Sequence, residues 1–253
     1  MTALNALKWL VPRPVRRWLR ATQRHLATWP PVGAVDLGDL RRVSPVSRSF
    51  GFDRGRCVDR YYIEKFLSRH AADVRGRVLE IGDDRYTRMF GGDKVVKSDV
   101  LHAVEGNPHA TIVADLTTGE GLTNETFDCI IFTQTLPFIY EYRAALRHLY
   151  RILAPGGVLL ATFPGISQIS RYDADRWGDY WRFTSMSARR LFAEVFPPEA
   201  VEVEAYGNVL AAVALLHGLA VEDITPEELE HCDPDYEVII AVRAVKPREA
   251  GDG

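Results

Sequence analysis

Three acidic residues lie where strands are expected to end. Glu80 closes one apolar stretch, Asp99 closes a second stretch nineteen residues later, and Asp115 follows a third. A carboxylate at a strand end can accept hydrogen bonds from both hydroxyls of a ribose, and another can meet the exocyclic amine of a base. Gly82 opens the loop after the first stretch, where a backbone without a side chain can lie close to a ligand. This spacing predicts a nucleotide-like ligand beside a sheet edge.

A second group of chemically active residues fills the segment 165–184. The segment contains two Trp, two Tyr, one Phe, three Asp and three Arg. Aromatic faces suit the C–H faces of a sugar or another polyhydroxyl ring, and the charged groups suit its hydroxyls. We therefore expect a substrate to be bound by Tyr172, Asp173, Trp177, Tyr180, Trp181 and Arg182. The alternative is a loop whose aromatic side chains only pack on the domain.

If the substrate reacts through a hydroxyl, a base must take its proton. Asp175 is the first candidate because it lies among the aromatic residues, and His102, close to Asp99 in the chain, is the second. A lone histidine in this position is also compatible with an ordinary surface residue. The sequence has no metal-ligand spacing, so we expect no catalytic metal.

Strand and helix patterns that could position these residues alternate through most of the chain. The strand patterns lie at residues 77–81, 95–100, 111–114, 127–133, 158–163, 201–206 and 236–245. Four helices are expected: one begins at Asp59, and the others lie at 141–153, 187–196 and 209–219. Such alternation predicts a doubly wound α/β fold with a seven-stranded, mainly parallel sheet. Few residues separate the first three strands, so little helix is expected between them.

The N-terminal part of the chain has a different charge from the remainder. Residues 1–60 contain twelve Lys and Arg against four Asp and Glu, a net charge of +8, and residues 61–253 have a net charge of −11. Residues 15–29 predict a basic amphipathic helix with arginines opposite Trp18 and Trp29. Such a helix can lie peripherally on an anionic membrane or pack on its own domain. We predict an N-terminal extension and linker at 1–50, a catalytic domain at 51–247 and a tail at 248–253.

Overall composition excludes several classes of protein. The 253 residues have a formal net charge of −3, which gives no reason to expect a nucleic-acid partner. Three widely spaced cysteines fit neither a disulfide framework nor a zinc cluster, which favours a cytoplasmic location. No stretch approaches the roughly 18 apolar residues of a membrane-spanning helix.

The ordered strand ends resemble those of class I S-adenosylmethionine-dependent methyltransferases, near the small-molecule group called type 11. The matching residues, within 59–245, are Leu79-Glu80-Ile81-Gly82, Asp99, Ala114-Asp115-Leu116, Phe127-Asp128 and Arg151-Ile152-Leu153-Ala154-Pro155-Gly156-Gly157. The resemblance implies a Rossmann-like methyltransferase fold and S-adenosylmethionine as cofactor. It assigns cofactor binding to Glu80, Gly82, Asp83, Asp84, Asp99, Val100, Asp115, Leu116, Gln134 and Tyr61.

The family pattern also indicates what each part of the site does. The glycine loop passes the methionine portion of the cofactor, the second acid binds ribose, the third acid lies by the adenine, and residues after the fourth strand line the methyl site. In related methyltransferases the helix equivalent to the one that begins near Asp59 closes over the cofactor, which implies that Arg60 and Tyr61 touch its carboxylate. The alternative is ordinary packing of an N-terminal helix.

One departure from the family leaves alternatives open, because Asp84 and Tyr86 replace the second and third glycines of the loop. The first interpretation is an enzyme that O-methylates a sugar-like or secondary-metabolite hydroxyl, with a small-molecule or glycan acceptor. The alternative is a non-catalytic scaffold that docks at a membrane. A nicotinamide-dependent oxidoreductase is disfavoured because the next glycine after Gly82 is Gly91.

Overall fold

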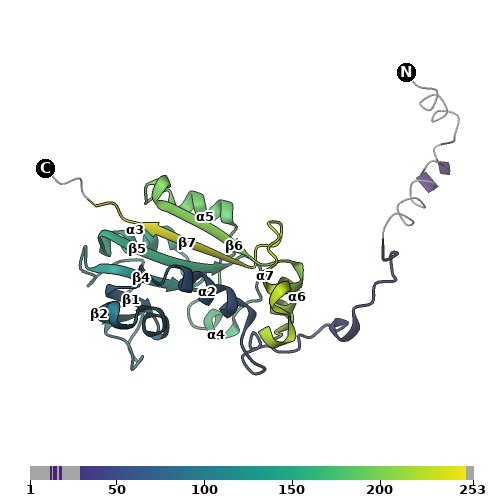
Figure 1. The fold of residues 1–253 in the computed structure, drawn as a ribbon, viewed down its shortest axis with the longest axis horizontal. Helices are drawn as coiled ribbons and strands as arrows, with labels where there is room; N and C mark the ends of the chain where they lie inside the picture. Colours follow the sequence, from purple (N-terminus) through teal and green to yellow (C-terminus); the bar gives the residue numbers. More distant parts are fainter. Residues whose placement is uncertain (1–11, 13, 16, 19–28, 249–253) are drawn as a thin grey trace, which may run out of the picture. The chain divides into compact units, whose positions relative to one another are not determined.

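In a computed structural model, which describes residues 12, 14, 15, 17, 18 and 29–248, seven strands form one sheet in the order β3-β2-β1-β4-β5-β7-β6 (Figure 1). The strands are β1 Gly76–Ile81, β2 Val95–His102, β3 Ile112–Val113, β4 Phe127–Thr133, β5 Leu153–Pro164, β6 Val201–Tyr206 and β7 Ile239–Val245. Strands β1 to β5 pair in parallel, and β7 is antiparallel to both β5 and β6. The predicted mainly parallel sheet is confirmed, and the carboxyl ends of β1 to β5 share one edge.

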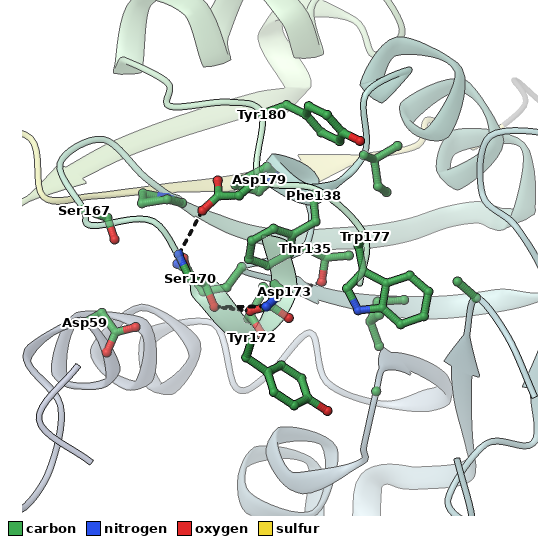
Figure 2. Close-up of a pocket in the computed structure, with 18 of the residues that line it drawn as sticks. Asp59, Thr135, Phe138, Ser167, Ser170, Tyr172, Asp173, Trp177, Asp179 and Tyr180 are labelled. Atoms are coloured by element: carbon green, nitrogen blue, oxygen red, sulfur yellow. Dashed lines mark hydrogen bonds between the residues drawn. The ribbon is translucent and has the colours of Figure 1, made fainter. Parts of the chain in front are cut away.

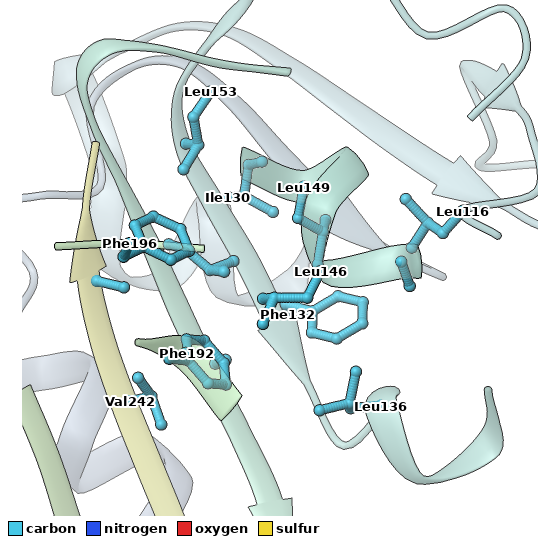
Figure 3. Close-up of a cluster of buried hydrophobic side chains, with 14 of the residues drawn as sticks. Leu116, Ile130, Phe132, Leu136, Leu146, Leu149, Leu153, Phe192, Phe196 and Val242 are labelled. Carbon is cyan, nitrogen blue, oxygen red and sulfur yellow. The ribbon is translucent and has the colours of Figure 1, made fainter. Parts of the chain in front are cut away.

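Helices cover both faces of the sheet, so the side chains of β4 are buried on both sides. The helices are α2 Val58–Arg69, α3 Tyr142–Ile152, α4 Arg171–Ala174, α5 Ser185–Phe192, α6 Val209–His217 and α7 Pro226–Glu230. On one face, Phe132 packs in a cluster with Leu146 of α3 and Phe192 of α5 (Figure 3). On the other face, Ile131 packs in a cluster with residues of α2 and α6. Alternating residues of one strand therefore contribute to two cores, as a doubly wound fold requires.

The connection between β1 and β2 is short, as the sequence predicted. A π-helical turn, Thr87–Gly91, and a 3₁₀ turn, Gly92–Lys94, replace a full helix. Between β2 and β3 the chain forms a loop with no helix in it. This edge of the sheet is consequently covered less than the centre.

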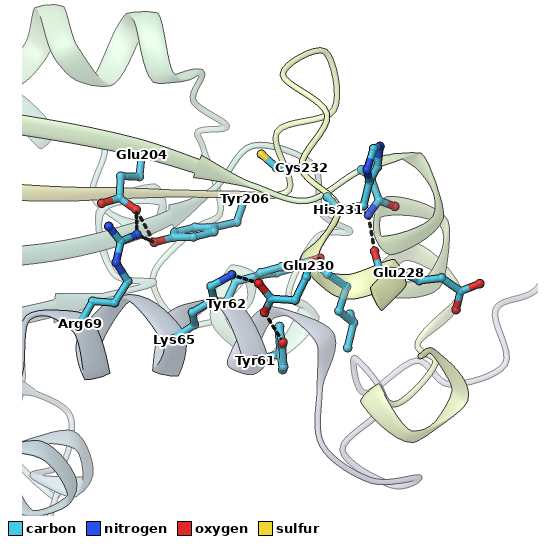
Figure 4. Close-up of polar contacts among 12 residues, drawn as sticks. Tyr61, Tyr62, Lys65, Arg69, Glu204, Tyr206, Glu228, Glu230, His231 and Cys232 are labelled. Atoms are coloured by element: carbon cyan, nitrogen blue, oxygen red, sulfur yellow. Dashed lines mark hydrogen bonds and ion pairs between the residues drawn. The ribbon is translucent and has the colours of Figure 1, made fainter. Parts of the chain in front are cut away.

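Side chains of helix α2 bond to α7 and to β6, and these contacts hold the helix against the rest of the domain (Figure 4). Tyr61 and Lys65 both bond the carboxylate of Glu230 at the end of α7. One turn later, Arg69 donates to Glu204 of β6 at 2.5 Å. The predicted start of this helix at Asp59 is close to the observed start, but its N-cap residue is Cys57.

The chain divides into two compact units, Met1–Ser44 and Pro45–Gly253. In the first unit the structure describes a short 3₁₀ helix, Gly38–Leu40 (η3). Most of the predicted basic helix at residues 15–29 lies outside the described residues.

The second unit begins with a segment that the sequence predicted to be part of a surface linker. We call residues 45–52 the strap. The backbone N–H groups of Val46 and Ser47 donate to the carbonyl of His217 at 2.8 and 3.0 Å, and Ser47 is buried. Gly218 has a φ of +65°, and a Cβ at this position would lie 2.3 Å from the carbonyl oxygen of Ser47. The strap packs so closely on the end of α6 that only glycine can occupy position 218.

Candidate active site

A cavity of about 1070 Å³ opens beside the carboxyl ends of the parallel strands (Figure 2). Its walls come from the strap, the first turn of α2, the loops after β1 to β4, and the segment that follows β5. Single-ligand sites measure roughly 300–1000 Å³. The cavity is therefore at the upper end of the sizes seen for ligand sites.

The cavity brings together most of the residues that the sequence singled out. Those that line it are Glu80, Gly82, Asp83, His102, Asp115, Leu116, Gln134, Tyr172, Asp173, Trp177, Tyr180 and Arg182. Those that do not line it are Tyr61, Asp84, Asp99, Val100, Asp175 and Trp181. The two groups of predicted residues, on the early strands and in the segment 165–184, thus face one space.

The loop after β1 has open space at Gly82, and its backbone is held by hydrogen bonds to the buried carboxylate of Glu80. Gly82 has a φ of +85°, and a Cβ added there would meet nothing within 4 Å. Glu80 is only 2% exposed and accepts hydrogen bonds from the N–H groups of Tyr86 and Thr87 at 3.1 and 2.7 Å. Burial raises the pKa of Glu80 to about 7, against the effect of these hydrogen bonds. Glu80 therefore holds the loop in shape with both of its oxygens.

Tyr86, which stands where the family has a third glycine, is accommodated by burial. It is 3% exposed, and its ring stacks on Phe90 at 6.1 Å between centroids. Its hydroxyl accepts a hydrogen bond from Nη1 of Arg60 at 2.9 Å. Asp84, in place of the second glycine, forms an ion pair with Arg88 at 3.0 Å, outside the cavity lining. The two replacements thus have structural partners of their own.

Arg60 is the residue of α2 that is best placed for an anionic ligand. Its guanidinium lies in the cavity wall, and its Nε is buried without a hydrogen-bond partner in the part of the chain that the structure describes. An unpaired buried donor is costly, and a ligand carboxylate would satisfy it. Tyr61, predicted to share this task, bonds Glu230 and does not line the cavity, so its contact with the cofactor stays a prediction.

Asp99 and Val100 do not reach the cavity because β2 continues to His102, beyond the predicted end at residue 100. Asp99 pairs with Leu79 in the middle of the sheet and accepts a hydrogen bond from Nε of Arg77 at 2.7 Å. Burial acts to raise the pKa of Asp99, but the hydrogen bonds from Arg77 and Thr111 bring it below its usual value. Asp99 therefore lies outside the cavity lining, and its contact with ribose stays a prediction.

His102 occupies the strand end that was predicted for Asp99. Its Nδ1 lies 2.8 Å from the carbonyl oxygen of Val104, which only accepts hydrogen bonds. Nδ1 therefore carries the proton of the neutral ring, and Nε2 is left as an acceptor. The ring of Trp177 meets the ring of His102 edge-on at 5.6 Å, so the strand end and the aromatic segment are in contact.

The segment 165–184 is held by an internal ion pair. Arg182 donates to both carboxylate oxygens of Asp179 at 2.5 and 3.0 Å, and the side chain of Asp179 is 2% exposed. The N–H of Ser170 donates to the same carboxylate at 3.0 Å, and Arg182 also reaches the carbonyl of Gln168 at 2.8 Å. Arg182, predicted to bind substrate, thus has its guanidinium engaged within the segment.

Two predicted residues of this segment lie elsewhere. The side chain of Asp175 is 62% exposed and pairs with Arg171 at 3.5 Å, outside the cavity lining, so its role as a catalytic base stays a prediction. Trp181 packs edge-on against Tyr142 of α3 at 5.1 Å and has no atom in the cavity lining. This placement agrees with the alternative interpretation, in which aromatic residues of the segment pack on the domain.

Gln134, directly after β4, adopts a backbone conformation that is unusual for its type. Its φ is +50°, and its N–H donates to the carbonyl of Thr162 at 2.7 Å. A non-glycine residue in the left-handed region costs about 1–3 kcal/mol and persists where the surrounding structure enforces it. Gln134 lines the cavity, where such strain is common.

Besides Leu215 of α6 and Ile239 of β7, the sequence missed two other parts of the wall. One is the strap, which contributes Arg48, Ser49, Phe50 and Phe52. The other is Asp59, which the sequence identified only as a helix cap. Asp59 directly precedes Arg60 on a helix expected to close over the cofactor, and this position could have indicated that Asp59 lines the cavity.

Among the residues that the structure describes, no three His, Cys, Asp or Glu side chains converge so that they could hold a metal ion. Within the same residues, no helix combines the length and apolar character needed to cross a bilayer.

Comparisons with known proteins agree with this architecture. The model of a family described as methyltransferase domain matches residues 56–203. The N-methyltransferase NodS from Bradyrhizobium japonicum WM9, solved with S-adenosyl-l-homocysteine, is 15% identical with a TM-score of 0.50, covering 81% of this chain and 95% of that one. A SAM-dependent methyltransferase from Archaeoglobus fulgidus is 12% identical with a TM-score of 0.50, covering 74% and 94%. At these identities the structures show a shared fold. No curated protein matches the sequence.

Proposed function

Because the chain belongs to the methyltransferase domain family, we propose that it transfers a methyl group from S-adenosylmethionine to a hydroxyl of a sugar-like or secondary-metabolite acceptor. The observation that carries the proposal is one cavity that joins the glycine loop to the aromatic segment. The non-catalytic alternative is weaker, since Tyr86 is buried and leaves the loop open at Gly82.

The residues present fit the cofactor. Gly82 gives the backbone an open face toward the cavity, and Arg60 offers the buried, unpaired Nε to a carboxylate. His102 at the end of β2 offers Nε2 to a ribose hydroxyl, and Asp115 follows β3 on the side expected for the base. The sulfonium of S-adenosylmethionine supplies an already activated methyl group, so the protein mainly has to place the acceptor in line with it.

The acceptor half of the cavity supports a polyhydroxyl ring. Tyr172 and Tyr180 are 67% and 49% exposed and line the cavity from the segment 165–184, and Asp173, next to Tyr172 in the chain, lines it too. Exposed aromatic rings next to a carboxylate match the alternating apolar faces and hydroxyl edges of a sugar. The same wall could receive an amine, and the assay below separates the two acceptor classes.

Tyr172→Ala and Tyr180→Ala are each expected to lower kcat/KM roughly two- to tenfold, because an aromatic contact contributes about 0.5–1.5 kcal/mol. The assay measures release of S-adenosylhomocysteine with a panel of p-nitrophenyl glycosides, and with matching amino sugars. The affinity for S-adenosylhomocysteine, measured by calorimetry, should not change. The control is Tyr236→Ala, which removes an exposed tyrosine outside the cavity. Equal turnover in all three variants would contradict the acceptor site, and turnover of amino sugars alone would contradict O-methylation.

The proposal also includes a peripheral membrane contact through residues 15–29. It is supported by the +8 charge of residues 1–60 and by the exposure of Trp18 and Trp29, 65% and 89%. Each basic residue near an anionic surface contributes about 1 kcal/mol, screened within about 10 Å at moderate salt. The full chain is expected to sediment with phosphatidylserine vesicles at low salt and to be released at high salt. A variant that lacks residues 1–30 should stay in the supernatant, and equal sedimentation of both proteins would count against the contact.

A further inference from the structure

Asp59 is a carboxylate of the cavity that the proposed function leaves without a task. It lies in the first turn of α2, and Figure 2 shows it on one side of the cavity, with Ser167 and Ser170 on the other. Its Oδ1 accepts the N–H of Arg60 at 2.7 Å. Its Oδ2 has no hydrogen-bond donor among residues 29–248. The carboxylate is partly buried and has one oxygen available to a ligand.

The other carboxylates in the cavity wall are engaged or exposed. Glu80 and Asp179 each use both oxygens within the protein. Asp83 and Asp115 are exposed and use Oδ1 to hold the turns that follow β1 and β3. Asp173 accepts the hydroxyl of Ser170 at 2.5 Å. Glu141 is exposed at the rim of the cavity.

We propose that Asp59 is the catalytic base that takes the proton from the acceptor, an inference that rests on the proposed methyl transfer. As the acceptor oxygen forms its bond to the methyl carbon, its proton passes to Oδ2 of Asp59. The carbon–sulfur bond breaks with its electron pair remaining on sulfur, which leaves neutral S-adenosylhomocysteine. The protonated carboxyl then returns the proton to water, so that charge and atoms balance over the cycle.

The surroundings of Asp59 suit this role. Burial raises its pKa, the neighbouring charge of Arg60 lowers it, and Glu64 on the same helix raises it. The cavity lining also includes charged or titratable groups from the other elements around it: Arg48, Glu80, Asp83, Arg85, His102, Asp115, Glu141, Arg171, Asp173, Asp179 and Arg182. A carboxylate with a raised pKa binds a proton more strongly than an ordinary one, as a base must.

The test compares Asp59→Asn with wild type and with Asp235→Asn, an exposed aspartate outside the cavity. With p-nitrophenyl glycosides as the acceptor probe, Asp59→Asn should lower kcat roughly a hundred- to ten-thousandfold. Its affinity for S-adenosylhomocysteine and its thermal midpoint should match wild type. In wild type kcat should rise with pH through the pKa of a carboxyl, and Asp59→Asn should lack this rise.

A second readout needs no acceptor. In protein labelled with ¹³C at the aspartate carboxyls, the resonance that disappears in Asp59→Asn should titrate above the ordinary midpoint for aspartate, which is about 3.9. A midpoint at or below that value would overturn the base, as would wild-type turnover in Asp59→Asn. A loss of S-adenosylhomocysteine affinity in this variant would overturn it too, since Asp59 would then be holding the cofactor. If wild type itself releases no product with any probe, the proposed function fails instead.

Discussion

Asp179→Ala is expected to lower the free energy of unfolding by about 3–5 kcal/mol, the cost of removing one partner from a buried ion pair. Arg182 would lose both hydrogen bonds to the carboxylate, and the N–H of Ser170 would lose its acceptor. The guanidinium would remain partly buried without its counter-charge. Urea denaturation followed by circular dichroism measures the effect, and activity toward the glycoside probes should fall with it because the segment carries Tyr172 and Tyr180.

The control for this prediction lies in the same segment. Asp175→Ala removes the carboxylate of an exposed ion pair, with side chains 75% and 62% exposed. Such pairs contribute about 0–1 kcal/mol, so this variant should unfold close to wild type. The double substitution of Asp179→Leu with Arg182→Met should recover much of the lost stability, since no unpaired charge is left. Equal destabilisation by the two single substitutions would show that burial of the pair is not what holds the segment.

Arg60→Met is expected to weaken the binding of S-adenosylhomocysteine about ten- to a hundredfold, because a charge-assisted hydrogen bond contributes roughly 1.5–3 kcal/mol. The substitution keeps a long side chain in the wall and removes the donors. The measurement is calorimetry with S-adenosylhomocysteine and, in parallel, with 5′-methylthioadenosine, which lacks the amino-acid end. Affinity for the second ligand should be unchanged.

Two matched variants sharpen this result. Tyr86→Phe keeps the buried ring but removes the hydroxyl that accepts from Arg60, so it should produce a smaller loss of affinity for S-adenosylhomocysteine. Arg69→Met changes an arginine on the same helix that bonds Glu204 away from the cavity, and it should bind as wild type does. An equal loss for both ligands in Arg60→Met would place the arginine at another part of the cofactor.

The sheet was predictable because its strands carry strong local patterns. The bounds of β4 and β6 agree with the prediction, since apolar or alternating residues begin and end sharply there. The bounds of β2 and β5 differ because pairing with a neighbour extends each strand. Leu101 and His102 of β2 continue into pairs with β3, and Leu153 of β5 pairs with Phe127. Such pairing depends on residues far apart in the chain and leaves no local signal.

The site was predictable in its parts and less so in its details. Gly82 and the aromatic segment face the cavity, as their types indicated. Asp99 does not, because an extension of β2 moved the strand end to His102. Asp59 was missed because its importance arises only where α2, the strap and the segment after β5 converge. No pattern within a single element records that convergence.

The strap affects how this protein can be divided and recombined. A fragment beginning at residue 51, where the sequence places the start of the domain, would discard Arg48, Ser49 and Phe50 and with them part of the cavity wall. It would also remove Val46 and Ser47, whose N–H groups donate hydrogen bonds to the carbonyl of His217. The first compact unit ends at Ser44, so a fusion joined before Pro45 would retain every residue of the cavity wall.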